Sequence, residues 1–361
     1  VTKTLPLLSI FDSNDIIYKS ARLESGDDQN LKKKKITIFN NKKIKLGYYS
    51  ADFRNHAVSY QLNKLIELHS REKFEIFAFS FFNKKDEMQQ NLSKIFDHFI
   101  DVETMSDEDI AKLSKKNKID IAIDLMGFTQ NNRFNIFKIG CAPIQINFLG
   151  YAGTTGSKFI DYIIADKIVI PKEKQKNYSE KIIYLPHCFM INDDSKNASL
   201  DQVKKENYNL PKNKFVFANF NKFYKITPNI FNTWMQLLAK IPNSILWLAN
   251  DNNTGRKNIV KKAIESGLHE DRIFFADKMP KYADYIERLK NIDLYLDTYP
   301  YSSHVIGCDV VKADVPIVTL SGETFASNVC ASILNDLKLS ELVTKNIDEY
   351  KNKIIEICKS E

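Results

Sequence analysis

The feature that most constrains the fold of this chain is an alternation of short apolar runs with stretches of helical periodicity. Runs of four to eight residues rich in Ile, Val, Phe and Tyr predict buried β-strands, and the periodic stretches between them predict helices. In the first half, the predicted strands are Lys45–Ser50, Phe74–Phe81, Ile119–Leu125, Ile144–Leu149 and Tyr162–Ala165. Between the first two strands, one helical face carries Leu62, Leu65, Ile66 and His69. This order is typical of βαβ units in a parallel sheet.

The same alternation restarts after the polar segment Asn192–Asn213. The predicted strands of the second half are Phe215–Phe220, Ile245–Leu248, Arg272–Ala276, Tyr295–Asp297 and Ile317–Leu320. Thr227 and Pro228 are residue types favoured at the N-cap and first position of a helix. Because 361 residues exceed a single core, two α/β domains are expected. We predict an N-terminal extension at 1–42, a first doubly wound domain at 43–195, a linker at 196–213 and a second domain at 214–361.

Composition excludes several classes of protein. The net charge of +7 comes from 52 Lys and Arg against 45 Asp and Glu, and the basic run Lys32–Lys35 has no interleaved aromatic residues. It therefore predicts a solvated loop rather than a nucleic-acid arm. No stretch approaches the roughly 20 apolar residues of a membrane helix. Five cysteines without CxxC spacing argue against a zinc site or a disulfide framework, which fits the cytoplasm. Because the chain begins at Val1, we interpret it as part of a longer protein.

Polar clusters follow the predicted strands of the first half, at the sheet edge where parallel α/β folds bind ligands. They are GYYSADFRNH (Gly47–His56), DLMGFT (Asp124–Thr129) and PIQINFLGYAGTTGS (Pro143–Ser157). His56 is a candidate catalytic residue, although a His after a strand is also a common local hydrogen-bond partner. Gly150 permits a close backbone approach to a ligand, or simply a tight turn.

In the second half, Lys222 and Lys225 lie in a loop before the helix predicted to begin at Pro228. A lysine at a helix entrance, beside free backbone N–H groups, is suited to a diphosphate, although many lysines at such positions are only solvated. Downstream, LDTYPYSSHVIGCD places His304 and Asp309 on another predicted helix. Its N-terminus is suited to a phosphate, and Asp309 to ribose hydroxyls. Neither half carries the usual dinucleotide-binding or P-loop fingerprint.

Together these strings resemble the catalytic region of glycosyltransferase family 41, the O-linked N-acetylglucosamine transferase and SPINDLY-like family. In the family's order, the matching strings are GYYSADFRNHAVSYQL, DLMGFTQNNRF, APIQINFLGYAGTTGSKFIDYIIAD, YSEKIIYLPHCF, NFNKFYKITP, PNSILWLA and GETFASNVCASIL. Seven collinear motifs are more specific than any single one. The resemblance implies an α/β GT-B architecture, in which two Rossmann-like doubly wound domains face a central cleft. It further implies inverting, metal-independent transfer of N-acetylglucosamine from UDP-N-acetylglucosamine to Ser or Thr of proteins, without a cofactor.

The resemblance also implies roles for individual residues. His56 and Lys225 correspond to the family's cleft histidine, which has been proposed as a base, and to its catalytic lysine on the diphosphate. A cation there stabilises the negative charge that grows as the sugar leaves. His304 would orient the donor sugar or phosphate, and Asp309 would hold ribose. The implied donor-binding residues are Gly150, Asn221, Lys222, Lys225, Tyr285, His304, Val305, Ile306 and Asp309.

The chain departs from the family pattern at several of these positions. Val305 and Ile306 stand where the family has two threonines on the diphosphate, and each lost hydrogen bond to a charged group is worth roughly 1.5–3 kcal/mol. Lys222 replaces a frequent Gln, and Tyr285 replaces a His near the base and ribose. Three alternatives therefore stay open: GDP-fucose to Ser or Thr, UDP-glucose to Asn, or a catalytically weakened protein-binding module. The family also implies N-terminal tetratricopeptide repeats and a C-terminal helix in the full-length protein, neither visible here.

Overall fold

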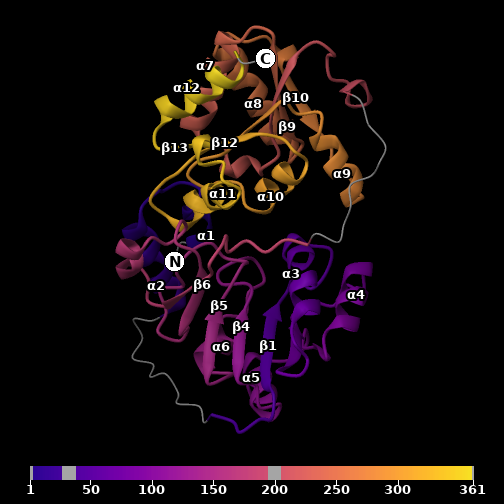
Figure 1. Cartoon of the computed structure of the whole chain (residues 1–361), viewed down its shortest axis with the longest axis vertical. Coiled ribbons are helices and arrows are strands. Elements are labelled where there is room, and N and C mark those ends of the chain that lie inside the picture. Colours follow the sequence, from indigo (N-terminus) through magenta and orange to yellow (C-terminus); the bar gives the residue numbers. More distant parts are fainter. Residues whose placement is uncertain (1–2, 27–37, 194–204, 360–361) are drawn as a thin grey trace. The chain divides into compact units, whose positions relative to one another are not determined.

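A computed structural model describes residues 3–26, 38–193 and 205–359, and the chain divides into two compact units (Figure 1). The first unit comprises Val1–Leu7 and Ser13–Ser195, and the second comprises Leu8–Asp12 and Lys196–Glu361. The basic run Lys32–Lys35 and residues 196–204 of the predicted linker lie outside the described residues. The described part of the predicted linker begins with the 3₁₀ helix η2 (Lys205–Tyr208).

The first unit is built on a parallel seven-stranded sheet with the order β3-β2-β1-β4-β5-β6-β7. Its strands are β1 (Ile44–Ser50), β2 (Phe74–Ser80), β3 (His98–Asp101), β4 (Ile121–Asp124), β5 (Ile144–Asn147), β6 (Tyr162–Ala165) and β7 (Lys181–Tyr184). Its helices are α1 (Thr4–Leu7), α2 (Asn14–Ser25), α3 (Ala57–Leu68), α4 (Glu87–Ile95), α5 (Asp107–Lys116), α6 (Asn135–Ile139) and η1 (Lys172–Asn177). Part of the predicted N-terminal extension is thus helical.

Helices cover both faces of this sheet. On one face, α3 and α4 bury Leu62, Ile66 and Leu92 against the strands. The two α3 residues belong to the face that the sequence predicts, with four-residue spacing. On the other face, the Tyr49 ring of β1 meets the Phe137 ring of α6 edge-on at 5.5 Å, and its hydroxyl lies 2.6 Å from Ser114 Oγ of α5. Burial on both faces explains why the central strands are nearly continuous apolar runs.

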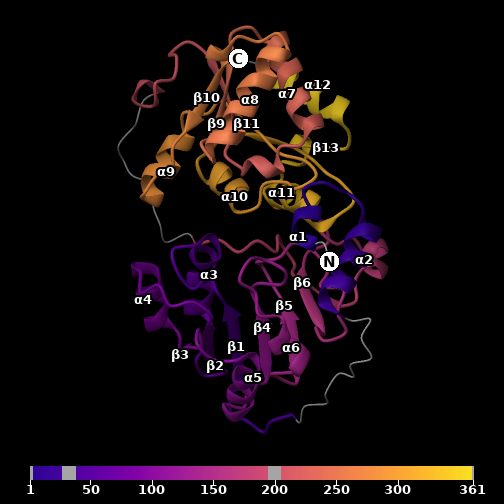
Figure 2. The same cartoon turned by 180° about the vertical axis from the view of Figure 1, so that it is seen from behind.

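The second unit has a parallel six-stranded sheet with the order β10-β9-β8-β11-β12-β13 (Figure 2). Its strands are β8 (Phe215–Asn219), β9 (Ser244–Ala249), β10 (Ile273–Ala276), β11 (Leu294–Leu296), β12 (Ile317–Leu320) and β13 (Val343–Thr344). Its helices are α7 (Pro228–Lys240), α8 (Asn253–Glu265), α9 (Tyr282–Leu289), α10 (Val305–Lys312), α11 (Phe325–Asp336) and α12 (Ile347–Ile357), with short 3₁₀ helices η3 (Phe223–Lys225), η4 (Glu270–Arg272) and η5 (Ser340–Leu342).

Alternate residues along the strands of the second sheet pack into two separate hydrophobic cores. Phe217 of β8 packs with α7, α8 and α12, whereas its neighbours Val216 and Ala218 pack with α9, α10 and α11. Thr227 occupies the predicted N-cap position of α7, but its hydroxyl donates to the carbonyl of Tyr299 at 3.0 Å and makes no capping bond. Within the described ranges, no helix is long and apolar enough to cross a membrane.

The strand order of each sheet reverses beside its first strand. In the first sheet, β1 lies between β2 and β4; in the second, β8 lies between β9 and β11. At such a reversal, the loops after the two central strands diverge and leave a crevice for ligands. The loops that carry His56 and Lys225 follow β1 and β8, so both lie at a reversal point of their own sheet.

Candidate active site

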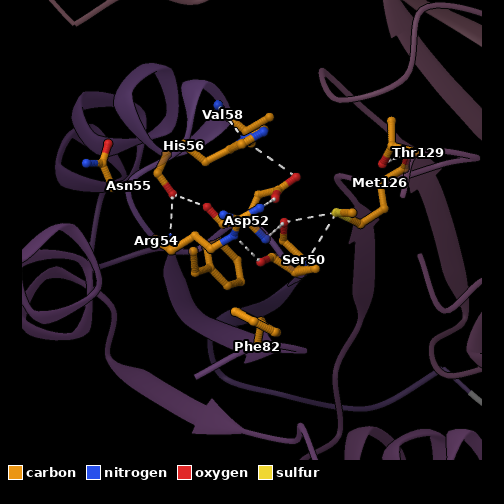
Figure 3. Close-up of polar contacts among 12 residues, drawn as sticks. Ser50, Asp52, Arg54, Asn55, His56, Val58, Phe82, Met126 and Thr129 are labelled. Carbon is orange, nitrogen blue, oxygen red and sulfur yellow. Dashed lines mark hydrogen bonds and ion pairs between the residues drawn. The ribbon is translucent and has the colours of Figure 1, made fainter. Parts of the chain in front are cut away.

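His56 lies in the loop from β1 to α3, at the N-cap of α3 (Figure 3). Its Nδ1 accepts a hydrogen bond from the Val58 N–H at 3.3 Å and lies 3.5 Å from Asp52 Oδ2. Arg54 donates to the other carboxylate oxygen of Asp52 at 3.0 Å. Burial lowers the pKa of His56, Asp52 opposes this shift and Arg54 adds to it. The imidazole is therefore neutral at pH 7 with its proton on Nε2, so it presents a donor there.

The loop after β4 meets the loop of His56, and the loop after β5 packs on the loop after β4. Met126 Sδ accepts from Ser50 Oγ at 3.3 Å and from the Ala51 N–H at 3.4 Å (Figure 3). Gly150 packs against the carbonyl of Leu125, and a Cβ at Gly150 would overlap that oxygen. Glycine is therefore needed at this position for backbone packing. The contact of Gly150 with a donor stays a prediction.

Lys225 is buried in the second unit, at 9% exposure. Its Nζ lies 3.7 Å from the centroid of the Tyr301 ring, 3.4 Å from the carbonyl oxygen of Ser302 and 3.5 Å from Asn221 Oδ1. Among the described residues, no carboxylate lies within ion-pair distance of the amine. Burial lowers the pKa of Lys225 to about 7, although the negative charge of Asp297 opposes this shift. An incoming anion would favour the charged form of this amine.

His304 lies directly before α10 and shares the aromatic neighbour of Lys225. The His304 ring is 4.7 Å from the Tyr301 ring, and its Nε2 lies 3.3 Å from the carbonyl oxygen of Ala326. Burial and the charge of Lys225 both keep the pKa of His304 well below its usual value. Since Nε2 then donates to Ala326, Nδ1 remains an acceptor. Val305 begins α10, whose first turn carries N–H groups that have no partner within the helix.

Asp309 lies one turn further along α10 and is buried. Its Oδ1 accepts a hydrogen bond of 2.6 Å from the hydroxyl of Tyr282 in α9. Burial raises the pKa of Asp309 to about 7, although Tyr282 and Lys312 oppose this shift. The Tyr285 ring lies 6.2 Å from the Tyr282 ring. Asp309 and Tyr285 therefore belong to one cluster between α9 and α10.

Two predicted donor-binding residues are engaged with the protein itself. Lys222 is largely exposed, and its Nζ lies 2.5 Å from Asp251 Oδ1, so it forms an ion pair before α8 instead of joining Lys225. The Asn221 amide donates to Ser303 Oγ at 2.7 Å and accepts from Lys225. Asn221 therefore fixes the loop around the buried amine.

Comparison with known proteins decides the family. The sequence model of glycosyl transferase family 41 matches residues 22–205 and 197–360. The chain belongs to glycosyltransferase family 41. It is 36% identical over 324 residues to the probable UDP-N-acetylglucosamine–peptide N-acetylglucosaminyltransferase SEC of Arabidopsis thaliana, covering 88% of this chain and 33% of that protein. It is 29% identical over 322 residues to the protein of the same description called SPINDLY, also from Arabidopsis thaliana, covering 87% and 35%. The chain thus spans about a third of the length of these relatives.

A solved structure supports the fold of this family 41 chain. A variant of the O-GlcNAc transferase of Thermobaculum terrenum superposes with a TM-score of 0.86 at 24% sequence identity, covering 96% of this chain and 66% of that one. This likeness confirms the predicted α/β fold of GT-B type, with two Rossmann-like parallel sheets.

Two further residues of this family 41 chain lie near Lys225 and were not predicted from the sequence. Tyr301 contacts both Lys225 and His304, yet an aromatic residue in a loop carries no signal of a cation beside it. Asp297 is buried and accepts from the Ser303 N–H at 2.7 Å, and its charge acts on Lys225. Its place at the end of a predicted strand is the signal that could have identified it.

Proposed function

We propose that this family 41 chain is a protein O-glycosyltransferase that transfers N-acetylglucosamine from UDP-N-acetylglucosamine to Ser or Thr hydroxyls, with inversion, without a metal ion and in the cytoplasm. The observation that carries the proposal is the buried amine of Lys225, beside His304 and the start of α10, without a carboxylate in ion-pair distance among the described residues. A buried cation that lacks such a partner is costly, and a diphosphate would supply the missing negative charge. The names of the Arabidopsis relatives support this donor and a peptide acceptor.

The chemistry follows from where charge develops. The acceptor oxygen bonds to the anomeric carbon while the bond from that carbon to the diphosphate breaks, and the proton of the acceptor hydroxyl passes to solvent water. Negative charge then grows on the diphosphate, where protonated Lys225 and the first N–H groups of α10 stabilise it. Neutral His304 would accept from a sugar hydroxyl through Nδ1, and Asp309 would accept from ribose.

His56 suits a positioning role better than that of a base. A base needs a free lone pair, but Nδ1 already accepts from Val58, and Nε2 carries the proton. We therefore assign the Nε2–H of His56 to hold an acceptor or donor oxygen. Retention of activity by a His56→Gln variant, which keeps an N–H donor, would agree with this assignment.

One observation favours a second candidate. Val305 and Ile306 supply no hydroxyl at the first turn of α10, so the site has fewer donors for a diphosphate than the family pattern implies. The same fold with GDP-fucose or UDP-glucose, or a protein-binding module with weakened catalysis, would tolerate this loss.

A donor panel tests the proposal. The full chain is incubated with a Ser- and Thr-containing peptide and UDP-N-acetylglucosamine, UDP-glucose or GDP-fucose, with and without EDTA. We expect transfer from UDP-N-acetylglucosamine alone, undiminished by EDTA, and a larger rise in melting temperature with UDP than with GDP. Fucose transfer would reassign the donor. If neither nucleotide shifts melting at millimolar concentration, the protein-binding module becomes the better account.

A further inference from the structure

Asp12 lies outside both sheets, and its carboxylate accepts five hydrogen bonds from described residues. It ends the segment Leu8–Asp12, which belongs to the second unit although the chain on either side of it belongs to the first. Its Oδ2 accepts from the Tyr299 hydroxyl and the Glu323 N–H, both at 2.7 Å. Its Oδ1 accepts from the Thr324 N–H at 2.9 Å and Ser327 Oγ at 2.8 Å. One carboxylate thus binds a loop and a helix start together.

These contacts favour the charged form of the Asp12 carboxyl group. Apart from the Tyr299 hydroxyl, the donors lie at the start of α11, where backbone N–H groups lack partners within the helix and the helix dipole favours an anion. Burial disfavours the charged form of Asp12, but the hydrogen bonds from Tyr299, Glu323, Thr324 and Ser327 outweigh it and lower its pKa. A Cβ at Gly322 would overlap the Asp12 carboxylate, so the loop fits closely around it.

The same two elements hold the surroundings of Lys225. The carbonyl oxygen of Ala326, in the first turn of α11, accepts from the Ser302 N–H at 3.1 Å, from Ser302 Oγ at 2.7 Å and from His304 Nε2 at 3.3 Å. The carbonyl oxygen of Ser302 in turn contacts Lys225 Nζ at 3.4 Å. Ser302 is held by Ala326 of α11 and lies three residues after Tyr299 in the chain. Asp12 binds both Tyr299 and the start of α11, so it acts on Ser302 from both sides.

We propose that Asp12 is a positioning residue for the nucleotide-sugar site. By holding Tyr299 and the first turn of α11, it fixes Ser302, and Ser302 fixes the buried amine and its histidine neighbour. The N-terminal segment is thereby part of the donor site, and displacing it weakens donor binding. This inference rests on the proposed function, because it takes the pocket of Lys225 to be the donor site.

Paired variants separate positioning from simple helix capping. In Asp12→Asn, one acceptor oxygen becomes an amide donor that faces other donors, which should raise the Kd for UDP and the donor KM about tenfold, with the acceptor KM unchanged. Tyr299→Phe removes one contact and should raise the Kd for UDP about threefold. The matched control is Asn346→Ala, which removes the side-chain cap of α12. It should lower the melting temperature without altering UDP binding.

Calorimetry with UDP, thermal melting and hydrogen exchange of the Ser302 amide are the measurements. We expect faster Ser302 exchange in Asp12→Asn, because that amide donates to Ala326. If Asp12→Asn melts lower, as Asn346→Ala does, but binds UDP within twofold of wild type, Asp12 is only a helix cap and the proposal is wrong. If wild type does not bind UDP, the proposed function fails, but hydrogen exchange at Ser302 still tests whether Asp12 positions Ser302. An unchanged exchange rate in both Asp12→Asn and the milder Tyr299→Phe would overturn that positioning role.

Discussion

Replacing Lys225 with Met is expected to abolish transfer and, at the same time, to raise the free energy of unfolding. The pKa of Lys225 is about 7 in the folded chain against 10.5 when solvated, so the unfolded chain binds the proton more tightly. Burying the charged amine of Lys225 therefore lowers the free energy of unfolding by its full amount below pH 7, and this cost disappears as pH rises from about 7 to 10.5. One pKa unit corresponds to about 1.4 kcal/mol, so a neutral side chain of similar length should add on the order of 4 kcal/mol of stability at pH 7.

The activity of Lys225→Met should fall because the charge that destabilises the fold also stabilises the leaving diphosphate. The leaving diphosphate loses the buried ammonium group of its proposed site, and removing one preorganised group of this kind costs about 10²–10³ in kcat. Transfer rate and urea unfolding at pH 7 are the measurements, with Lys240→Met as the matched control at an exposed lysine in the last turn of α7. The control should change neither quantity. Retained transfer by Lys225→Met would contradict the role assigned to Lys225. A lower free energy of unfolding would contradict the conclusion that the Lys225 amine is buried without an ion-pair partner.

Val305→Thr is expected to tighten UDP binding by roughly tenfold, since one hydrogen bond to a charged group is worth about 1.5–3 kcal/mol before the cost of ordering the side chain. Val305 is partly exposed at the first position of α10, and Thr has nearly the same shape, so the hydroxyl is added without a cavity. Ile306 is less suitable for this test because it packs on the core between the second sheet and α9–α11.

Calorimetry with UDP measures the effect, and Val305→Ala is the matched control because it removes the methyl groups without adding a hydroxyl. The control should bind UDP no tighter than wild type. If Val305→Thr and Val305→Ala behave alike, the diphosphate does not lie on the first turn of α10.

Central strands were predictable from the sequence, whereas most edge strands were not. Strands such as β1 and β8 lie between two neighbours and are covered on both faces, so their residues form apolar runs that stand out from the surrounding sequence. The sequence pattern did not predict β3, β7 and β13, which lie at sheet edges. Edge strands are short and partly exposed, and His98–Asp101 has no fully buried side chain. Five of the ten predicted strands, Ile144–Leu149 among them, also extended one or two residues past their observed ends, into the loops that follow.

The positions of candidate residues were more predictable than the directions of their side chains. Lys225 and His304 follow strands that a parallel sheet brings side by side, so topology alone places their loops together. Lys222 was expected to share the site, but it turns to Asp251, because a side chain's direction depends on neighbours distant in sequence. Asp12 is the extreme case: it lies 315 residues from Ser327, and no local pattern marks that contact.

The central claim is that the donor diphosphate charges the buried amine of Lys225. Calorimetric titration of UDP at pH 8, in two buffers with different ionisation enthalpies, measures the protons taken up on binding. Because the free amine has a pKa of about 7 and a neighbouring anion raises it, wild type should take up nearly one proton per UDP, and its affinity should fall as pH rises above 7. Lys225→Met should take up none. Equal proton uptake by the two proteins, or UDP binding of equal strength, would contradict the account.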